Sequence, residues 1–256
     1  MKELSIITVT YNAKALIERT LRSVEQQTAY QKIEHVIIDG ASSDGTTELL
    51  EDYYQRNKDH YPIIFTSEPD KGLYDAMNKG LSAATGQFIV YLNSGDMLHE
   101  PTTIEQVFSH DVSNVGVIYG DTNIVDDKGN FLFRRELTPP KHLTWKSFKN
   151  GMLVCHQSFY ARRSLCPSYD LSYRFSSDVD WCIKVMKAGK IAKMENLNTK
   201  IILTDYLNEG LSTKNHKASL MERFNVMKHH YGLLTTSLYH IKFLFRNLIR
   251  KIKKLW

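Results

Sequence analysis

Carboxylate side chains stand in several polar loops of this 256-residue chain, and two of them could do specific chemistry. Asp39 could accept hydrogen bonds from a nucleobase or a ribose, as acidic residues at strand ends do in other nucleotide-binding proteins. Asp96 could hold Mg²⁺ or Mn²⁺, because these ions prefer hard oxygen ligands. Taken alone, either residue could equally belong to a turn, since Asp, Asn and Gly are the usual turn residues.

The first hundred residues alternate short apolar runs with amphipathic stretches. The apolar runs predict strands over residues 4–10, 33–38, 63–67 and 88–92. Helical spacing predicts helices over residues 15–27, 46–57 and 74–85. This alternation argues for a parallel sheet covered on both faces, in which ligands bind beyond the carboxyl ends of the strands. The loops at those ends carry the carboxylates Asp39, Asp44, Glu68, Asp70 and Asp96.

The second half of the chain has a looser pattern that predicts an added antiparallel edge and a pocket wall. Turn chemistry in residues 126–129 predicts a hairpin between the runs 115–121 and 130–135. Further strands are expected within 151–162 and 191–204. Helices are predicted over 101–109 and 178–188.

Four segments, SIITVTYN, VIIDGASSDGT, SEPDKGLYDAMNKG and GQFIVYLNSGD, follow one another in this order. Over residues 3–205 the chain thereby resembles glycosyltransferase family 2, whose members are inverting enzymes, and in particular its polysaccharide, O-antigen and capsule biosynthesis members. The resemblance implies an α/β, Rossmann-like GT-A fold, a mainly parallel mixed sheet flanked by helices. The implied domain spans residues 1–215, with a nucleotide-binding half at 1–100 and an acceptor half at 101–215. A helical tail over 216–256 would follow it.

The resemblance also implies a nucleotide-sugar site. Its residues would be Thr8, Tyr11, Asn12, Asp39, Ser42, Asp70, Lys71, Asn78, Asn93 and Ser94. Asp96 matches the last residue of the family's DXD metal motif, which implies Mg²⁺ or Mn²⁺ as the cofactor. The chain departs from that motif, because neutral Asn93 or Ser94 stands at its first acidic position. Metal binding would therefore rest on Asp96 and on the diphosphate of the donor.

The segment FSSDVDWCIKV is similar to the family segment that holds the catalytic base. Asp178 matches the base, which would take the proton of the acceptor hydroxyl, and Asp180 is its acidic neighbour. By residue type alone, Asp178 could instead cap a helix, with Ser176 and Ser177 as competitors. Trp181 could pack against a sugar ring or belong to the core.

Three further pairs have two interpretations each. His156 and Gln157 resemble a segment that approaches the donor sugar and the acceptor, although a His on an apolar strand can also be a hydrogen-bonded structural residue. Arg162 and Arg163 could bind phosphate or form a solvated face. Ser212 and His216 fall where related enzymes close a loop over the diphosphate.

The net charge of +5 is concentrated at the C-terminus, which argues against a nucleic-acid-binding face. Basic residues there alternate with an apolar stripe consisting of Ile241, Leu244, Phe245, Leu248, Ile252 and Leu255. This pattern predicts a cationic amphipathic helix that lies on a membrane surface. The alternative is a terminal helix whose stripe docks on the domain. The sequence shows neither a signal peptide nor a membrane span, so we expect a cytoplasmic protein on the inner face of the cytoplasmic membrane.

These features predict transfer of a hexosyl or N-acetylhexosaminyl group from a nucleotide sugar, in particular a UDP-sugar. The acceptor would be a saccharide, free or linked to a polyprenyl diphosphate. The alternative is a catalytically degenerate nucleotide-sugar-binding scaffold of a polysaccharide assembly complex. A sugar nucleotidyltransferase is disfavoured, because Thr10-Tyr11-Asn12-Ala13 stands where its Gly-rich loop would follow the first strand.

Overall fold

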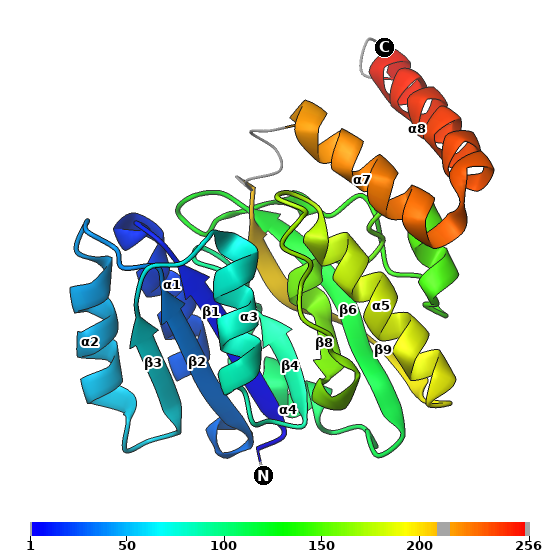
Figure 1. Cartoon of the computed structure of the whole chain (residues 1–256). Helices are drawn as coiled ribbons and strands as arrows, with labels where there is room; N and C mark the ends of the chain where they lie inside the picture. Colours follow the sequence, from blue (N-terminus) through cyan, green and yellow to red (C-terminus); the bar gives the residue numbers. More distant parts are fainter. Residues whose placement is uncertain (1, 209–215, 254–256) are drawn as a thin grey trace.

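The computed structural model describes residues 2–208 and 216–253 (Figure 1). Its first half is the predicted alternation of strands and helices. The strands are β1 (Leu4–Thr10), β2 (Ile33–Asp39), β3 (Ile63–Ser67) and β4 (Phe88–Tyr91). The helices between them are α1 (Lys14–Glu25), α2 (Thr46–Asn57) and α3 (Leu73–Ala83). The four strands are parallel, in the order β3-β2-β1-β4.

The second half extends this sheet with mixed strands. Its elements include β5 (Met97–Leu98), β6 (Val115–Val125), β7 (Phe131–Arg134), β8 (Phe159–Arg162) and β9 (Glu195–Leu207). β8 lies antiparallel between β4 and β6, while β9 runs parallel to β6 and antiparallel to β5. The predicted hairpin is confirmed as the antiparallel pair β6 and β7. The α/β, GT-A-like mixed sheet is therefore the observed architecture.

The strand expected within residues 151–162 is confirmed as β8. The short 3-10 helix η3 (His156–Ser158) precedes it. Before η3, the Arg135 guanidinium donates to the carbonyls of Met152 and Leu153.

Two apolar layers cover the sheet. On one face, Ile7 and Val36 pack with residues of α3 and of α5 (Ser177–Ile191). On the other face, Ile6 and Ile37 pack with α1, α2 and the short α4 (Thr103–Val107). Neighbouring strand residues thus point to opposite layers, which is why these strands read as continuous apolar runs.

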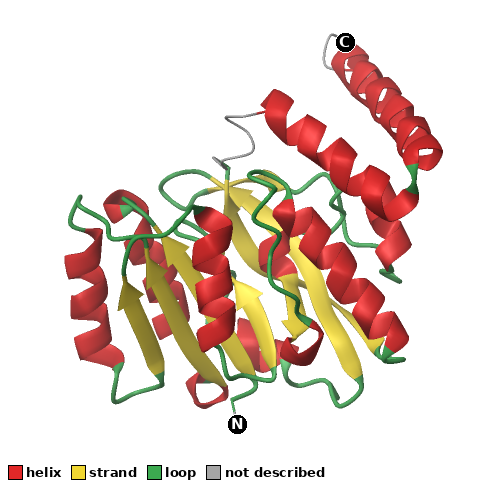
Figure 2. Cartoon of the chain, in the orientation of Figure 1, coloured by secondary structure: helices red, strands yellow, loops and turns green. Residues whose placement is uncertain are grey.

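The C-terminal region consists of two helices, α7 (His216–Tyr231) and α8 (Leu233–Lys253). Gly232, at φ +81°, turns the chain between them, a conformation that glycine adopts without strain. α7 packs against α5, and α8 extends away from the sheet (Figures 1 and 2). In the described ranges, no helix has the combination of length and apolarity that crossing a bilayer requires.

Candidate active site

The loops after β1 and β2 are joined by hydrogen bonds into one wall. The Asn12 amide donates to the Ser42 hydroxyl at 2.8 Å, and the Ser43 amide donates to Asn12 Oδ1 at 2.9 Å. Asn12 can form both contacts because it takes a left-handed conformation, with φ 48°, which Asn tolerates better than most residues. The Lys14 amide adds a bond to Asp44 Oδ2. Both loops therefore have a fixed relative position.

Asp39 lies at the end of β2, as predicted, but its carboxylate is fully buried. It accepts hydrogen bonds from the Ser42 amide, Ser42 Oγ, Thr47 Oγ1 and Ser67 Oγ. Three of these bonds reach Oδ2 and one reaches Oδ1, and the carboxylate has no exposed surface. In this conformation Asp39 orders the loop rather than facing a ligand.

Thr8 corrects another expectation about the nucleotide pocket. The side chain is fully buried, and its hydroxyl pairs with His35 Nε2 at 2.9 Å. Burial lowers the pKa of His35 to about 3, so this imidazole stays neutral. Thr8 belongs to the packing between the sheet and α2 and does not line an open pocket.

Tyr11, Asn12 and Lys71 are the exposed members of the predicted nucleotide site, and Asp70 is partly exposed. Tyr11 is 65% exposed. Gly40 lies near both Tyr11 and Asp70: a Cβ at position 40 would stand 2.6 Å from Asp70 Oδ2 and 3.2 Å from Tyr11 Cδ2. The absence of a side chain at Gly40 therefore leaves room for an aromatic ring and a carboxylate at the end of β2. The ring offers a stacking surface to a base, and the carboxylate offers an acceptor.

Asp96 follows β4 in the NSGD turn and is buried. It accepts from Gln157 Nε2 and from the Leu207 amide, each at 3.0 Å. Burial raises the pKa of Asp96 to about 7, and these two bonds and the Arg19 charge only partly offset that rise. Without a bound metal ion, the Asp96 carboxyl therefore still holds its proton close to neutral pH.

The residues of the NSGD turn offer the kind of oxygen ligands that a divalent cation binds, but too few of them to complete its coordination shell. Asn93 Oδ1 is buried and has no hydrogen-bond partner among the described residues, and Asp96 retains free lone pairs. Both are hard oxygens of the kind that Mg²⁺ and Mn²⁺ bind. Within residues 2–208 and 216–253 no group of three or more His, Cys, Asp or Glu forms a candidate metal site. A metal here would need the oxygens of the donor diphosphate to complete its shell.

The other polar residue of this turn, Ser94, contacts the protein itself, because its Oγ donates to the Val9 carbonyl at 3.4 Å.

Asp178 lies in the first turn of α5 and is partly exposed. Its Oδ1 accepts from Tyr74 Oη at 3.3 Å and from the Val179 amide at 2.9 Å. Its Oδ2 has no hydrogen bond with the described chain, so one oxygen is available to a ligand. Burial, and next the charge of Asp178, raises the pKa of the Tyr74 phenol, so Tyr74 stays protonated and can donate. Tyr74 stands within the SEPDKGLYDAMNKG segment, but no pattern there marked it as a contact of Asp178.

Asp96 and Asp178 come from distant parts of the sequence and influence neighbouring groups. Gln157 of η3 donates to Asp96. The adjacent His156 is buried, which lowers its pKa to about 4, while the charge of Asp178 acts in the opposite direction. Burial raises the pKa of the Tyr206 phenol in β9, and the charges of Asp96 and Asp178 raise it further. Both carboxylates therefore act on groups of the same region, around η3 and β9.

The aromatic residues around η3 form a core rather than a sugar platform. Trp181 is 1% exposed, stacks on Tyr169 and donates from Nε1 to the Pro167 carbonyl. The interpretation of Trp181 as a sugar-binding surface is therefore corrected to the core alternative. His156 is also buried and bonds the Tyr169 hydroxyl at 2.6 Å.

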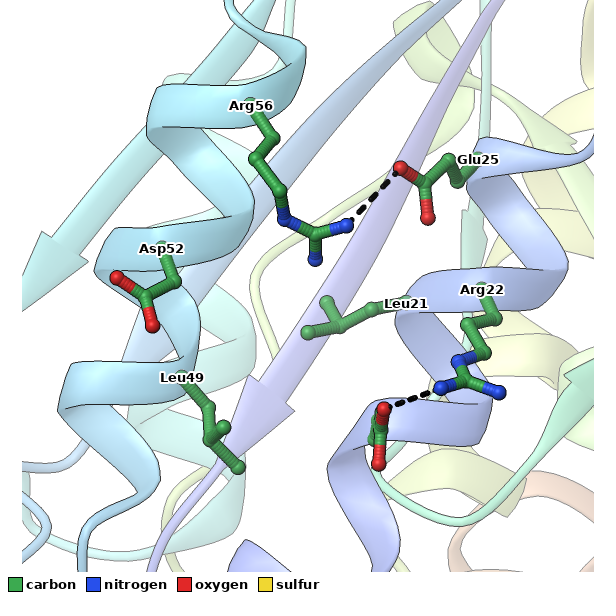
Figure 3. A pocket seen from close by; sticks show the side chains of 7 residues that line it. Leu21, Arg22, Glu25, Leu49, Asp52 and Arg56 are labelled. Carbon is green, nitrogen blue, oxygen red and sulfur yellow. Dashed lines mark hydrogen bonds and ion pairs between the residues drawn. The ribbon is translucent and has the colours of Figure 1, made fainter.

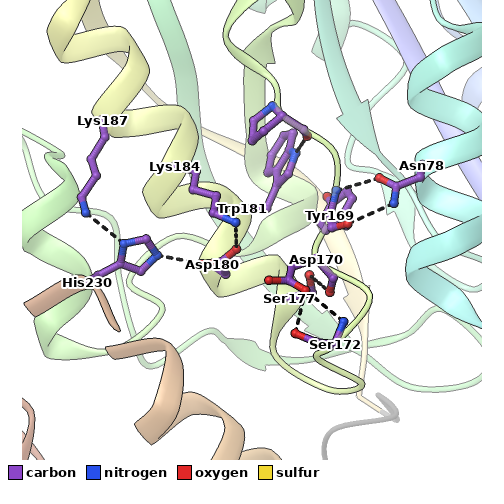
Figure 4. Close-up of polar contacts among 11 residues, drawn as sticks. Asn78, Tyr169, Asp170, Ser172, Ser177, Asp180, Trp181, Lys184, Lys187 and His230 are labelled. Carbon is purple, nitrogen blue, oxygen red and sulfur yellow. Dashed lines mark hydrogen bonds and ion pairs between the residues drawn. The ribbon is translucent and has the colours of Figure 1, made fainter. Parts of the chain in front are cut away.

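Asn78 and Asp180 are also engaged with the protein (Figure 4). Asn78 exchanges two hydrogen bonds with the backbone of Tyr169 and so ties α3 to the loop before α5. Asp180 is 1% exposed and pairs with Lys184 Nζ at 2.7 Å and His230 Nε2 at 2.8 Å. The acidic neighbour of the predicted base is therefore a buried link between α5 and α7.

Arg162 and Arg163 lie at the opposite edge of the sheet, because Arg162 pairs with Phe88 at the start of β4. Their guanidinium groups donate to backbone carbonyls, Arg162 to Val115 and Arg163 to Gly86. Both proposed roles, phosphate binding and a solvated face, are therefore wrong for Arg162. Ser212 and the His216 side chain lie outside the residues that the structure describes.

A shallow pocket elsewhere lies between α1 and α2 (Figure 3). Its two arginines form ion pairs, Arg22 with Glu18 and Arg56 with Glu25. It is on the flank of the sheet, away from the strand ends, so we do not assign the active site to it.

The sequence is similar to a protein family and to several known glycosyltransferases. Residues 5–167 match the model of glycosyl transferase family 2. A PGL/p-HBAD biosynthesis glycosyltransferase of Mycobacterium bovis (strain BCG / Pasteur 1173P2) is 31% identical over 187 residues, which cover 70% of this chain and 68% of that protein. The Escherichia coli UDP-Glc:alpha-D-GlcNAc-diphosphoundecaprenol beta-1,3-glucosyltransferase WfgD is 27% identical, over 87% of this chain and 84% of its own.

Solved structures share the fold. Staphylococcus aureus TarS 1–349 in complex with UDP-GlcNAc superposes with a TM-score of 0.68 at 18% identity, over 88% of this chain and 64% of that one. Glucosyl-3-phosphoglycerate synthase from Mycobacterium tuberculosis, in complex with Mn²⁺, UDP and glucosyl-3-phosphoglycerate, gives a TM-score of 0.56 at 14% identity, over 87% and 80%. With the family model covering more than half of its length, the chain belongs to glycosyl transferase family 2 and is a glycosyltransferase that uses a nucleotide-sugar donor.

Proposed function

We propose that the protein is an inverting enzyme that moves a hexosyl or N-acetylhexosaminyl group from a UDP-sugar to a saccharide carried on a polyprenyl diphosphate. The observation that carries this proposal is a pair of carboxylates in different environments: buried Asp96, which accepts a hydrogen bond from Gln157, and partly exposed Asp178, whose charge acts on the adjacent His156. WfgD, which its name describes as using UDP-Glc and a diphosphoundecaprenol-linked sugar, supports the choice of donor and acceptor. The UDP-GlcNAc complex of TarS supports a uridine nucleotide.

In the proposed reaction Asp178 is the general base. Its free Oδ2 takes the proton of the acceptor hydroxyl while the hydroxyl oxygen attacks the anomeric carbon of the donor sugar. The bond between that carbon and the diphosphate breaks, and UDP leaves on the opposite face with inversion. Tyr74 holds the other oxygen of Asp178 and so fixes the orientation of the carboxylate.

Asp96 would hold Mg²⁺ or Mn²⁺ together with the donor diphosphate, and Asn93 Oδ1 is a further available oxygen. A bound cation neutralises the charge of the departing diphosphate. Gln157 and the Leu207 amide orient Asp96 for this task. The Mn²⁺ complex of the mycobacterial synthase supports a metal.

The proposed workplace is the inner face of the cytoplasmic membrane, with α8 as the attachment. Described residues of α8 leave apolar side chains exposed on its surface: Leu233, Leu234, Leu238, Ile241, Leu244 and Phe245. The basic side chains of Lys242 and Arg246 donate hydrogen bonds to Asn150, to its side-chain oxygen and its carbonyl respectively. This arrangement favours the membrane interpretation over docking of the stripe on the domain.

A donor panel tests the proposal. The full chain is incubated with UDP-, GDP- and TDP-sugars, a prenyl-diphosphate-linked N-acetylglucosamine and Mn²⁺, and release of the nucleoside diphosphate is measured. We expect release from a UDP-sugar, and we expect a chelator to abolish it. A protein that binds UDP with no release from any donor would instead be the degenerate scaffold, for which the neutral Asn93 in the metal motif is the supporting observation.

A further inference from the structure

Glu222 of α7 holds the segment that leads into α5. Its carboxylate accepts hydrogen bonds from three successive backbone amides: Arg174 at 2.9 Å, Phe175 at 2.7 Å and Ser176 at 3.1 Å. One turn earlier on α7, the Ser219 carbonyl accepts from the Ser176 hydroxyl at 3.2 Å. One face of α7 thus fixes the three residues that stand immediately before α5.

These contacts bear directly on Asp178, which lies two residues after Ser176. The N-cap Ser176 makes no side-chain capping bond to α5, because its hydroxyl is used by α7. The entry into α5 therefore depends on another helix for its order. Hydrogen bonds to a carboxylate are stronger than bonds between neutral groups, and three of them converge on Glu222.

We propose that Glu222 is a positioning residue that sets the location of Asp178 through the backbone of residues 174–176. The inference rests on the proposed function, in which Asp178 is the base. Tyr74 offers a second link, because its hydroxyl contacts Asp178 and the pKa of its phenol is raised by burial, by Asp178 and, to a smaller extent, by Glu222. Glu222 therefore lies close to the Tyr74 and Asp178 pair.

Other contacts, which do not involve Glu222, hold α7 against α5. α7 has another attachment to α5, the buried bond between His230 and Asp180, and Val226 and Met227 of α7 are buried as well. Removal of Glu222 should therefore leave α7 docked while the segment before α5 loses its anchor. A displacement of about 1 Å of a catalytic group can cost a hundredfold in rate.

The experiment compares Glu222→Ala, Glu222→Gln and Asn225→Ala in the full chain. Asn225 is an exposed polar residue on the same helix and serves as the control. We expect Glu222→Ala to lower kcat by about 10- to 100-fold, with the donor KM within about threefold of the native value and the thermal midpoint retained. Glu222→Gln keeps one carbonyl acceptor and should lose less, while Asn225→Ala should match the native protein.

Asp178→Asn and the double variant Asp178→Asn/Glu222→Ala complete the test. If Glu222 acts through Asp178, the double variant loses no more activity than Asp178→Asn alone. The inference is overturned if Glu222→Ala and Glu222→Gln keep the native kcat while Asp178→Asn is inactive, or if the two losses multiply. Full activity of Asp178→Asn would instead reject the proposed function, and the inference with it.

Discussion

Three aspartates that follow the same sequence logic have three different environments. Asp39 is buried under four donors, Asp96 is buried with two bonds and a raised pKa, and Asp178 has one oxygen without a hydrogen bond to the described residues. The sequence places each of them beside a strand end or a helix start. It could not separate their roles, because burial and hydrogen-bond supply come from residues far away in the chain, such as Ser67 for Asp39 and Leu207 for Asp96.

Asp96 predicts an unusual dependence of stability on pH. Its folded pKa of about 7 is above the ordinary value, so the folded protein holds this proton more tightly than the unfolded chain does. The associated stability is present below pH 4 and is lost as the pH rises towards 7. The folded pKa lies about three units above the ordinary value, and each unit corresponds to about 1.4 kcal/mol. The stability that depends on this proton is therefore at most about 4 kcal/mol.

Asp96→Asn should remove this loss of stability at higher pH, because Asn does not titrate. In metal-free buffer we expect the stability of the variant relative to that of the native protein to increase from pH 5 to pH 8. With Mn²⁺ and donor present, we expect the variant to lose activity at both pH values. Thermal unfolding at the two pH values measures the effect, with Asp52→Asn on exposed Asp52 as the control. An identical pH dependence in native protein and Asp96→Asn would contradict the account of this site.

At the level of elements, the long buried strands and the amphipathic helices could be predicted, because their patterns repeat over several residues. β5 could not, since a pair of two residues has no periodicity. The 3-10 helix η3, with 3 residues, could not be predicted for the same reason. β5 is formed by pairing with β9, a contact that lies outside its local sequence.

The link between α5 and α7 yields a prediction of its own. Lys187 Nζ contacts His230 Nδ1, so Nε2 of His230 carries the proton that Asp180 accepts. Burial alone would raise the pKa of Asp180, but the bond from His230 and the pair with Lys184 outweigh it and hold the pKa below its ordinary value. The resulting stability is present above about pH 4 and is lost as the pH falls through the lowered pKa.

Asp180→Asn should therefore lower the free energy of unfolding by about 1.5–3 kcal/mol at pH 7. The difference from the native protein should narrow below pH 4, where the unfolded chain binds this proton before the folded protein does. Urea denaturation at pH 7 and pH 3 provides the measurement, again with Asp52→Asn as control. A difference that stays constant with pH would show that the charge of Asp180 does not stabilise the helix pair.

For the whole molecule, α7 and α8 connect the candidate site to an exposed apolar surface. The sequence predicted an amphipathic tail, but its periodicity could not tell whether the stripe faces the domain or solvent. In the structure Leu238 is 68% exposed and Ile241 is 51% exposed. We expect the full chain to sediment with vesicles of phosphatidylcholine and anionic phosphatidylglycerol.

Leu238→Glu/Ile241→Glu should weaken this binding at least about tenfold, because each buried aliphatic side chain contributes about 1.5–3 kcal/mol. Asn225→Glu, which adds a charge on exposed α7 surface, should bind vesicles as the native protein does. Native protein that remains in the supernatant with anionic vesicles would reject the membrane role of α8.

We propose Asp178 as the base of a sugar transfer from a UDP-sugar. The most direct test is the rate of UDP release by native protein and by Asp178→Asn, with acceptor and Mn²⁺ present. We predict a loss of at least about a hundredfold, in line with general-base catalysis, with UDP binding unchanged. A native rate in Asp178→Asn would contradict the assignment.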